Sequence, residues 1–199
     1  MITFKDLSIK EKIEHIWYYY KGIIIFGLAA VIIVSYLIGN FINKTDNVFN
    51  ISLMAGSVDS IKEDALEKDL TKFLIGEKPG KKRAGFEDYQ LASNNGKLSL
   101  DLNNAEKFLI TLNAGTSDLV IMPEDIYDNY KDKQIFEDLT KLSSFDYKEY
   151  KVMDNYFISL DKSTKIKAVV KSTEKLYAAI PAAAKDKEKS LECLKYLLK

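Results

Sequence analysis

Few residues after the first quarter of this chain have side chains suited to nucleophilic or metal chemistry. His15 is the only histidine and Cys193 the only cysteine. A Ser-His or Cys-His pair and a histidine metal site all need a histidine, and one thiol forms no intrachain disulfide. Cys193 stands between Leu191 and Leu194, so we interpret it as a small core residue of a helix. We therefore expect no enzymatic activity.

Carboxylates are plentiful, but their spacing favours a solvated helix surface. Asp64, Glu67 and Asp69 fall on polar positions of a predicted helix, where carboxylates are far more often exposed than paired for acid–base work. Gly56 and Ser57 follow a predicted strand, yet the glycines and lysine of a phosphate-binding loop do not surround them. The sequence therefore predicts no cofactor and no metal site.

One dense basic cluster stands out, formed by Lys78, Lys81, Lys82 and Arg83, the last being the only arginine in the chain. Such a cluster has two interpretations, contact with anionic lipid or a wall polymer, or a solvated loop between a helix and a strand. The solvated loop is the more common of the two. Because the whole chain has 29 basic and 29 acidic residues, we expect no nucleic-acid partner.

The strongest signal is an uncharged apolar segment from Gly22 to Ile42. At 1.5 Å per residue it spans about 31 Å, the thickness of the hydrocarbon core of a bilayer. Aromatic residues precede it at positions 17–20, as expected at a membrane interface. The segment therefore predicts a transmembrane helix.

The flanks of this segment predict its orientation. Lys10, Lys12 and Lys21 precede it closely, whereas only Lys44 follows closely, so the positive-inside rule places the N-terminus in the cytoplasm. Neither a small-residue cleavage site nor a lipoprotein cysteine follows the apolar run, which favours an uncleaved signal-anchor in the cell membrane. We expect a cytoplasmic amphipathic segment (1–21), a transmembrane helix (22–42), a linker (43–50) and an extracytoplasmic α/β domain (51–199).

Small residues recur every four positions along the predicted span: Gly27, Val31, Ser35 and Gly39. Such a pattern lets transmembrane helices approach closely, although glycine and serine are also common in single spans that pair with nothing. Two interpretations therefore stay open, a face for a partner helix and an ordinary anchor.

The remaining sequence alternates strand and helix patterns. The first predicted helix begins with a capping box of Ser60 and Glu63 and ends at Gly76. Later helices are expected after Asn103, after Pro123 and from Asp186. Predicted strands cover Ile51 to Ala55, Phe86 to Ala92, Lys97 to Leu102, Leu119 to Met122, Tyr156 to Leu160, Lys165 to Lys171 and Leu176 to Ile180. The opening β-α repeats predict an α/β fold with a mostly parallel sheet flanked by helices.

Two stretches carry a resemblance to a known family. The run AGTSDLVIMPEDIYDNYKDKQIFEDLTKL, from Ala114 to Leu142, and the tail AAIPAAAKDKEKSLECLKYLL, from Ala178 to Leu198, resemble segments of bacterial extracellular solute-binding proteins. With the first strand and helix, the resemblance covers about half of the outer domain. It implies a single periplasmic-binding-protein-like lobe. The chain departs from the family, whose members have two lobes and a lipoprotein cysteine or a cleaved signal.

Ligands of parallel sheets bind beyond the carboxyl ends of the strands. On that rule we expect a rim for a ligand or partner formed by Gly56, Ser57, Ser93, Asn94, Met122, Pro123 and Glu124. One lobe offers a shallow shelf that buries little of a small molecule, so a protein partner is favoured. The resulting hypothesis is a membrane-anchored accessory or binding protein that engages a membrane-protein partner, such as a transporter complex, or a second copy of itself. The alternative is a solute receptor that presents a small ligand to an ABC-type transporter.

Overall fold

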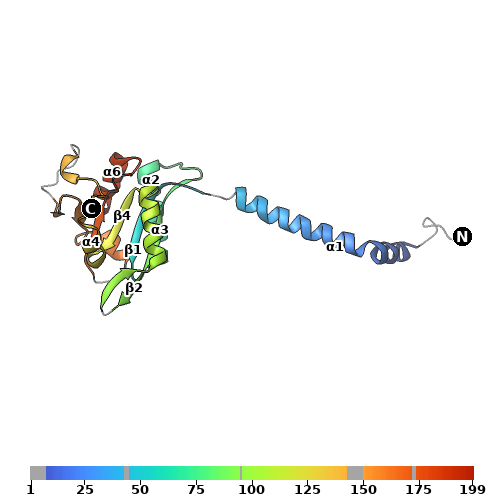
Figure 1. Cartoon of the computed structure of the whole chain (residues 1–199). Coiled ribbons are helices and arrows are strands. Elements are labelled where there is room, and N and C mark those ends of the chain that lie inside the picture. Colours follow the sequence, from blue (N-terminus) through green and yellow to red (C-terminus); the bar gives the residue numbers. More distant parts are fainter. Residues whose placement is uncertain (1–7, 43–44, 95, 143–149, 172–173) are drawn as a thin grey trace. The chain divides into compact units, whose positions relative to one another are not determined.

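A computed structural model describes residues 8–42, 45–94, 96–142, 150–171 and 174–199. The chain divides into two compact units, Met1–Lys44 and Thr45–Lys199, and each is described by itself (Figure 1).

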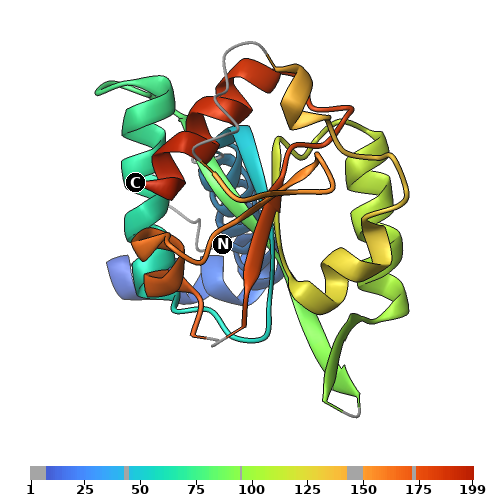
Figure 2. The same cartoon turned by 90° about the vertical axis from the view of Figure 1, so that its left-hand side faces the viewer.

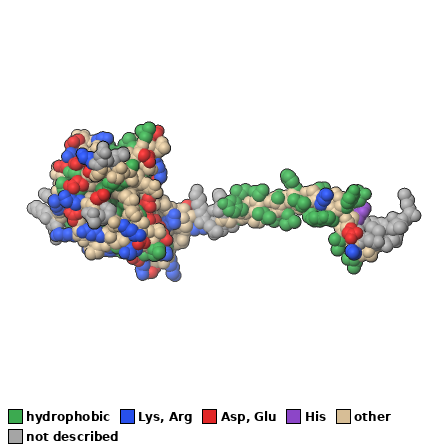
Figure 3. All heavy atoms as spheres, turned by 90° about the horizontal axis from the view of Figure 1, so that it is seen from below, with side chains coloured by type: hydrophobic (Ala, Val, Ile, Leu, Met, Phe, Trp, Pro, Cys, Tyr) green, Lys and Arg blue, Asp and Glu red, His purple; other side chains and the backbone are tan. Residues whose placement is uncertain are grey.

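The first unit is one helix, α1 (Ile9–Ile42), of 34 residues. An 18-residue window within Lys12–Gly39 has a mean hydropathy of 2.6, and none of that window is buried. Apolar side chains cover most of α1, and charged side chains gather toward its N-terminal part (Figure 3). Among the described residues, α1 is the one helix long and apolar enough to cross a membrane. From Ile9 onward, the predicted amphipathic segment is therefore continuous with the predicted span.

The second unit is built on a seven-stranded sheet with the strand order β3-β2-β1-β4-β7-β6-β5. The strands are β1 (Asp46–Ala55), β2 (Lys82–Asn94), β3 (Lys97–Leu100), β4 (Leu119–Pro123), β5 (Val152–Met153), β6 (Phe157–Ser159) and β7 (Leu176–Ala179). The helices are α2 (Ser60–Ile75), α3 (Leu102–Asn113), α4 (Glu124–Tyr130), α5 (Thr164–Val169) and α6 (Lys187–Leu198), with a short 3-10 helix at Leu139–Lys141. The predicted α/β class is confirmed.

The expected mostly parallel sheet is wrong. Only β1 pairs in parallel, with β2 on one side and β4 on the other. The other four pairs, β2 with β3, β4 with β7, β7 with β6 and β6 with β5, are antiparallel. The β5–β6 hairpin turns through Asp154 and Asn155, both at positive φ, a conformation that aspartate and asparagine tolerate better than most residues. The sequence analysis overlooked that turn.

Lys165 to Lys171 was predicted as a strand, and this is also wrong. Thr164–Val169 forms α5, because Ser163 caps it by accepting a hydrogen bond from the N–H of Ile166 at 3.2 Å. Ile166, Val169 and Val170 are buried, and their spacing of three and four residues is the helical one. In addition, β1 begins at Asp46, so most of the segment expected as a linker (43–50) belongs to the first strand.

Helices cover both faces of the sheet (Figure 2). One core packs Ile51, Leu53 and Ile121 of the central strands against α2, α5 and α6. The other packs Met54, Val120 and Met122 against α3 and α4. Alternate residues of the central strands thus serve opposite cores, as the period of a strand requires. We call the edge at which the parallel strands β1, β2 and β4 begin the amino edge, and the opposite edge the carboxyl edge.

Candidate functional site

The predicted rim residues separate in the structure. Gly56 and Ser57 are exposed directly after β1 and line a hollow of about 380 Å³ at the carboxyl edge. Met122 and Pro123 are buried at the end of β4, so their side chains are part of the core. Glu124 is exposed, forms an ion pair with Lys175 at 3.3 Å and accepts a hydrogen bond from the Tyr177 hydroxyl at 3.2 Å.

Ser93 and Asn94 lie beyond the rim, in the part of β2 that forms a hairpin with β3. The register pairs Gln90 of β2 with Ala55, the last residue of β1. Ser93 is three residues further along, or about 10 Å at the rise of a strand. It is exposed and pairs with Leu98 of β3. Of the seven predicted rim residues, only Gly56 and Ser57 line the hollow.

Two carboxyl groups that the sequence analysis missed give this hollow its chemistry. Glu63, on the first turn of α2, and Asp88, in β2, both line it and share a side-chain hydrogen bond. Burial, reinforced by the negative charge of Asp88, raises the pKa of Glu63 to about 7. Burial also raises the pKa of Asp88. The pair therefore exchanges a proton near neutral pH, and its remaining negative charge suits a cationic group.

The structure at the start of α2 explains why the Glu63 side chain can interact with Asp88. The sequence analysis assigned Glu63 to a capping box with Ser60, but the N-cap is Asp59, whose Oδ1 accepts from the N–H of Lys62 at 3.4 Å. The side chain of Glu63 interacts instead with Asp88, which pairs in register with Leu53 of β1. A charged residue in the interior of a predicted strand was the signal for Asp88, since strands rarely place aspartate there.

Glu67, expected as solvated surface, is half-buried. Its Oε1 accepts a hydrogen bond from the N–H of Phe86 at 2.7 Å. One turn further along α2, the Thr71 hydroxyl accepts from the N–H of Ala84 at 3.0 Å. Both bonds reach the part of β2 that pairs only with β1. Polar side chains of α2 thus accept hydrogen bonds from backbone N–H groups of β2 and fix the helix against this strand.

A second surface feature is an exposed apolar face on α3. Phe108, Thr111 and Leu112 are buried on its inner side. On its outer side Leu102 is 83%, Leu109 39% and Ile110 61% exposed. At 100° per residue these three side chains fall within about one third of the helix circumference. The exposed Glu106 falls in the same arc, between Leu102 and Ile110, so the apolar area is divided into Leu102 at one end of α3 and the adjacent Leu109 and Ile110 near the other.

The predicted packing face of the membrane helix lies on α1. Gly27, Val31 and Ser35 are exposed and Gly39 is half-buried. Nothing lies within 4 Å of the position that a Cβ would take at Gly27 or Gly39. A partner helix at this face stays a prediction.

Comparison of the chain with protein-family models, with curated proteins and with solved structures found no match. The resemblance to solute-binding proteins therefore rests on the quoted sequence stretches alone and stays a prediction.

Proposed function

We propose that this chain is a membrane-anchored accessory or binding protein whose domain engages a protein partner. In this proposal α1 crosses the cell membrane with its N-terminus in the cytoplasm, and the domain lies on the extracytoplasmic side. The partner is a protein of the same membrane, such as a subunit of a transporter complex. The apolar face of α3 is the observation that supports a protein partner most directly.

The chemistry of this face fits a protein better than a small molecule. Leu102, Leu109 and Ile110 follow the length of a 12-residue helix, about 18 Å at 1.5 Å per residue. A convex helix encloses no ligand, whereas an apolar helix or groove on a partner removes all three side chains from water. Burial of such side chains contributes about 25 cal/mol per Å² of apolar surface.

Matched isoleucine variants test this proposal. Ile110→Gln should reduce co-purification of the partner from mild detergent, because it replaces one of the two adjacent exposed apolar side chains, Leu109 and Ile110, by an amide. Ile61→Gln is the control, since Ile61 is also an exposed helical isoleucine (80%) but lies on α2. Quantitative mass spectrometry of cross-linked material from both variants measures the recovery. Equal recovery of every partner by the two variants would argue against the α3 face. Recovery of a second copy of the chain alone would identify a homo-oligomer.

The alternative function is a solute receptor that presents a small ligand to an ABC-type transporter. The hollow at the carboxyl edge favours it, because the Glu63–Asp88 pair supplies an acidic group within a concave surface of about 380 Å³. The ligand class on this reading is a small cationic solute. Such a solute would raise the melting temperature of the wild-type chain and have less effect on Glu63→Gln.

A further inference from the structure

A basic surface lies at the amino edge, on the segment that joins α2 to β2 and on the first two residues of β2. We call Lys78, Lys81, Lys82 and Arg83 the basic edge; all four are exposed. Lys185 and Lys189, at the start of α6, line a further hollow at the same edge of the sheet together with Asn47 of β1. The nearby acidic side chains include Glu77, which forms an ion pair with Lys72 at 2.8 Å. Asp118 and Asp186 line the same hollow as the two lysines, so the excess of positive charge where β1 begins comes from the basic edge itself.

Backbone and side-chain hydrogen bonds fix the basic edge to the first residues of β1. The N–H of Asp46 donates to the carbonyl oxygen of Lys81 at 2.8 Å. Arg83 Nε donates to Asn47 Oδ1 at 2.6 Å, and Asp46 pairs in register with Lys82. The position of the basic edge is thus set by the strand through which the chain enters the domain.

The chain itself limits how far this edge lies from α1. The apolar helix ends at Ile42 and β1 begins at Asp46. Four residue steps of fully extended chain span at most about 14 Å. If α1 crosses a bilayer, the short connecting chain therefore keeps the basic edge near the headgroup region. The carboxyl edge is separated from the amino edge by the length of β1, about 30 Å.

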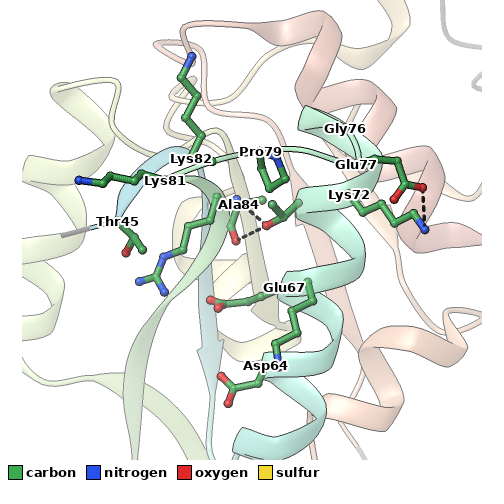
Figure 4. Close-up of a pocket in the computed structure, with 14 residues that line it drawn as sticks. Thr45, Asp64, Glu67, Lys72, Gly76, Glu77, Pro79, Lys81, Lys82 and Ala84 are labelled. Carbon is green, nitrogen blue, oxygen red and sulfur yellow. Dashed lines mark hydrogen bonds and ion pairs between the residues drawn. The ribbon is translucent and has the colours of Figure 1, made fainter. Parts of the chain in front are cut away.

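Two lysines of the basic edge are directed outward. Figure 4 shows Lys81 and Lys82 extending away from the neighbouring hollow, while Asp64 and Glu67 lie along its other side. That hollow, of about 490 Å³, has carboxylates as well as lysines in its lining, so it does not form an anion-binding cavity. Within the described part of the chain, no ion pair involves Lys78, Lys81 or Lys82. Their charges are free for an external surface.

We propose that the basic edge docks onto the anionic phosphate headgroups of the bilayer that α1 crosses. This rests on the membrane anchoring in the proposed function. Tethering makes docking an intramolecular event with a high effective concentration, and each lysine near an anionic surface strengthens it about five-fold. Docking would place the amino edge next to the membrane and the acidic hollow at the carboxyl edge away from it.

Fluorescence quenching in reconstituted vesicles tests this docking. The full chain carries a fluorophore on Ala183→Cys, an exposed position beside Gly115 at the amino edge, or on Ser57→Cys at the carboxyl edge. Vesicles contain phosphatidylcholine alone or with phosphatidylglycerol, plus a lipid with a nitroxide headgroup. We expect phosphatidylglycerol to increase quenching at position 183 but not at position 57, and added salt to reverse it.

Two triple variants supply the decisive comparison. The first variant removes three charges of the basic edge through Lys78→Gln, Lys81→Gln and Lys82→Gln. It should lower the ratio of docked to undocked domain about a hundred-fold. The control replaces Lys97, Lys162 and Lys167 by glutamine, which makes the same change in net charge at exposed positions away from the amino edge, and should quench like the wild type. Vesicle flotation reports insertion of α1 separately, so a failure of anchoring is distinguished from a failure of docking.

Two outcomes would overturn the proposal. One is equal quenching at position 183 with and without phosphatidylglycerol in vesicles that float with the protein. The other is binding of soluble polyphosphate by the wild-type chain, but not by the basic-edge variant, without any effect of phosphatidylglycerol. In that case the basic edge recognises a soluble anionic polymer.

Discussion

At the residue scale, the raised pKa of Glu63 makes stability depend on pH. The ordinary value is 4.5, and the folded chain holds it at about 7. Between these values the folded chain retains a proton that the unfolded chain has lost, so the free energy of unfolding decreases as pH rises. The raised pKa of Asp88 acts in the same direction. Because Glu63 is only half-buried and Asp88 is exposed, solvent screens the pair, and we expect a loss of about 1 kcal/mol across this window.

Melting temperatures of the full chain in detergent between pH 4.5 and 8 measure this effect. Glu63→Gln should flatten the dependence and be more stable than the wild type above pH 7. Asp69→Asn, an exposed position on the same helix whose charge does not affect the pKa of Glu63, is the matched control and should leave the slope unchanged. A wild-type stability that increases with pH over this window would show that the pair is not formed.

The same two carboxyl groups show what sequence reasoning about the site could and could not achieve. Gly56 and Ser57 were found because a strand end followed by small residues is a local pattern. Glu63 and Asp88 are 25 residues apart in the chain. Their contact depends on how α2 packs on β2, so no local sequence pattern predicts it. Met122 and Pro123 were misplaced because the end of β4 is covered by α4.

At the element scale, the connection from α3 to β4 depends on one glycine. Gly115 has a φ of 61°, and a Cβ there would lie 2.5 Å from the carbonyl oxygen of Ala183. Gly115→Ala should therefore destabilise the domain by about 2 to 4 kcal/mol, because the left-handed conformation and the backbone clash both oppose it.

Chemical denaturation of Gly115→Ala against Gly56→Ala measures that cost. Nothing lies within 4 Å of a Cβ at Gly56, and its φ is not positive, so this variant should unfold close to the wild-type midpoint. Similar midpoints for the two variants would mean that the α3–β4 connection tolerates a side chain at position 115.

Elements with strong local signals were predicted well and elements decided by tertiary contacts were not. The stripe after Ser60 and the glycine at position 76 predicted α2, and Asp186 does begin the last helix as its N-cap. In contrast, α5 was taken for a strand, because six residues with valine and isoleucine fit either period. The direction of β7 depends on its pairing between β4 and β6. The order of strands and helices along the chain does not predict that pairing.

At the scale of the whole molecule, the proposed function depends on a division between an apolar helix and a polar domain with its own core. All residues of the two hydrophobic cores lie from Phe49 onward, and α1 contributes exposed apolar side chains. The sequence predicted this division from the uncharged segment Gly22 to Ile42, which is long enough to span the hydrocarbon core of a bilayer. The basic cluster was already visible in the sequence, but its place at the amino edge beside the start of β1 needed the structure. The α3 face also needed it, because that face depends on which side chains stay exposed.

Cysteine accessibility in intact cells tests the central claim, a single-pass anchor with an extracytoplasmic domain, most directly. The native Cys193 is buried, which raises the pKa of its thiol, so it stays inert toward a membrane-impermeant maleimide. Two exposed positions are replaced separately, Ser8→Cys before α1 and Glu188→Cys on α6. We predict that position 188 reacts in intact cells and position 8 only after lysis. Labelling of position 8 with protection of position 188 in intact cells would contradict the account.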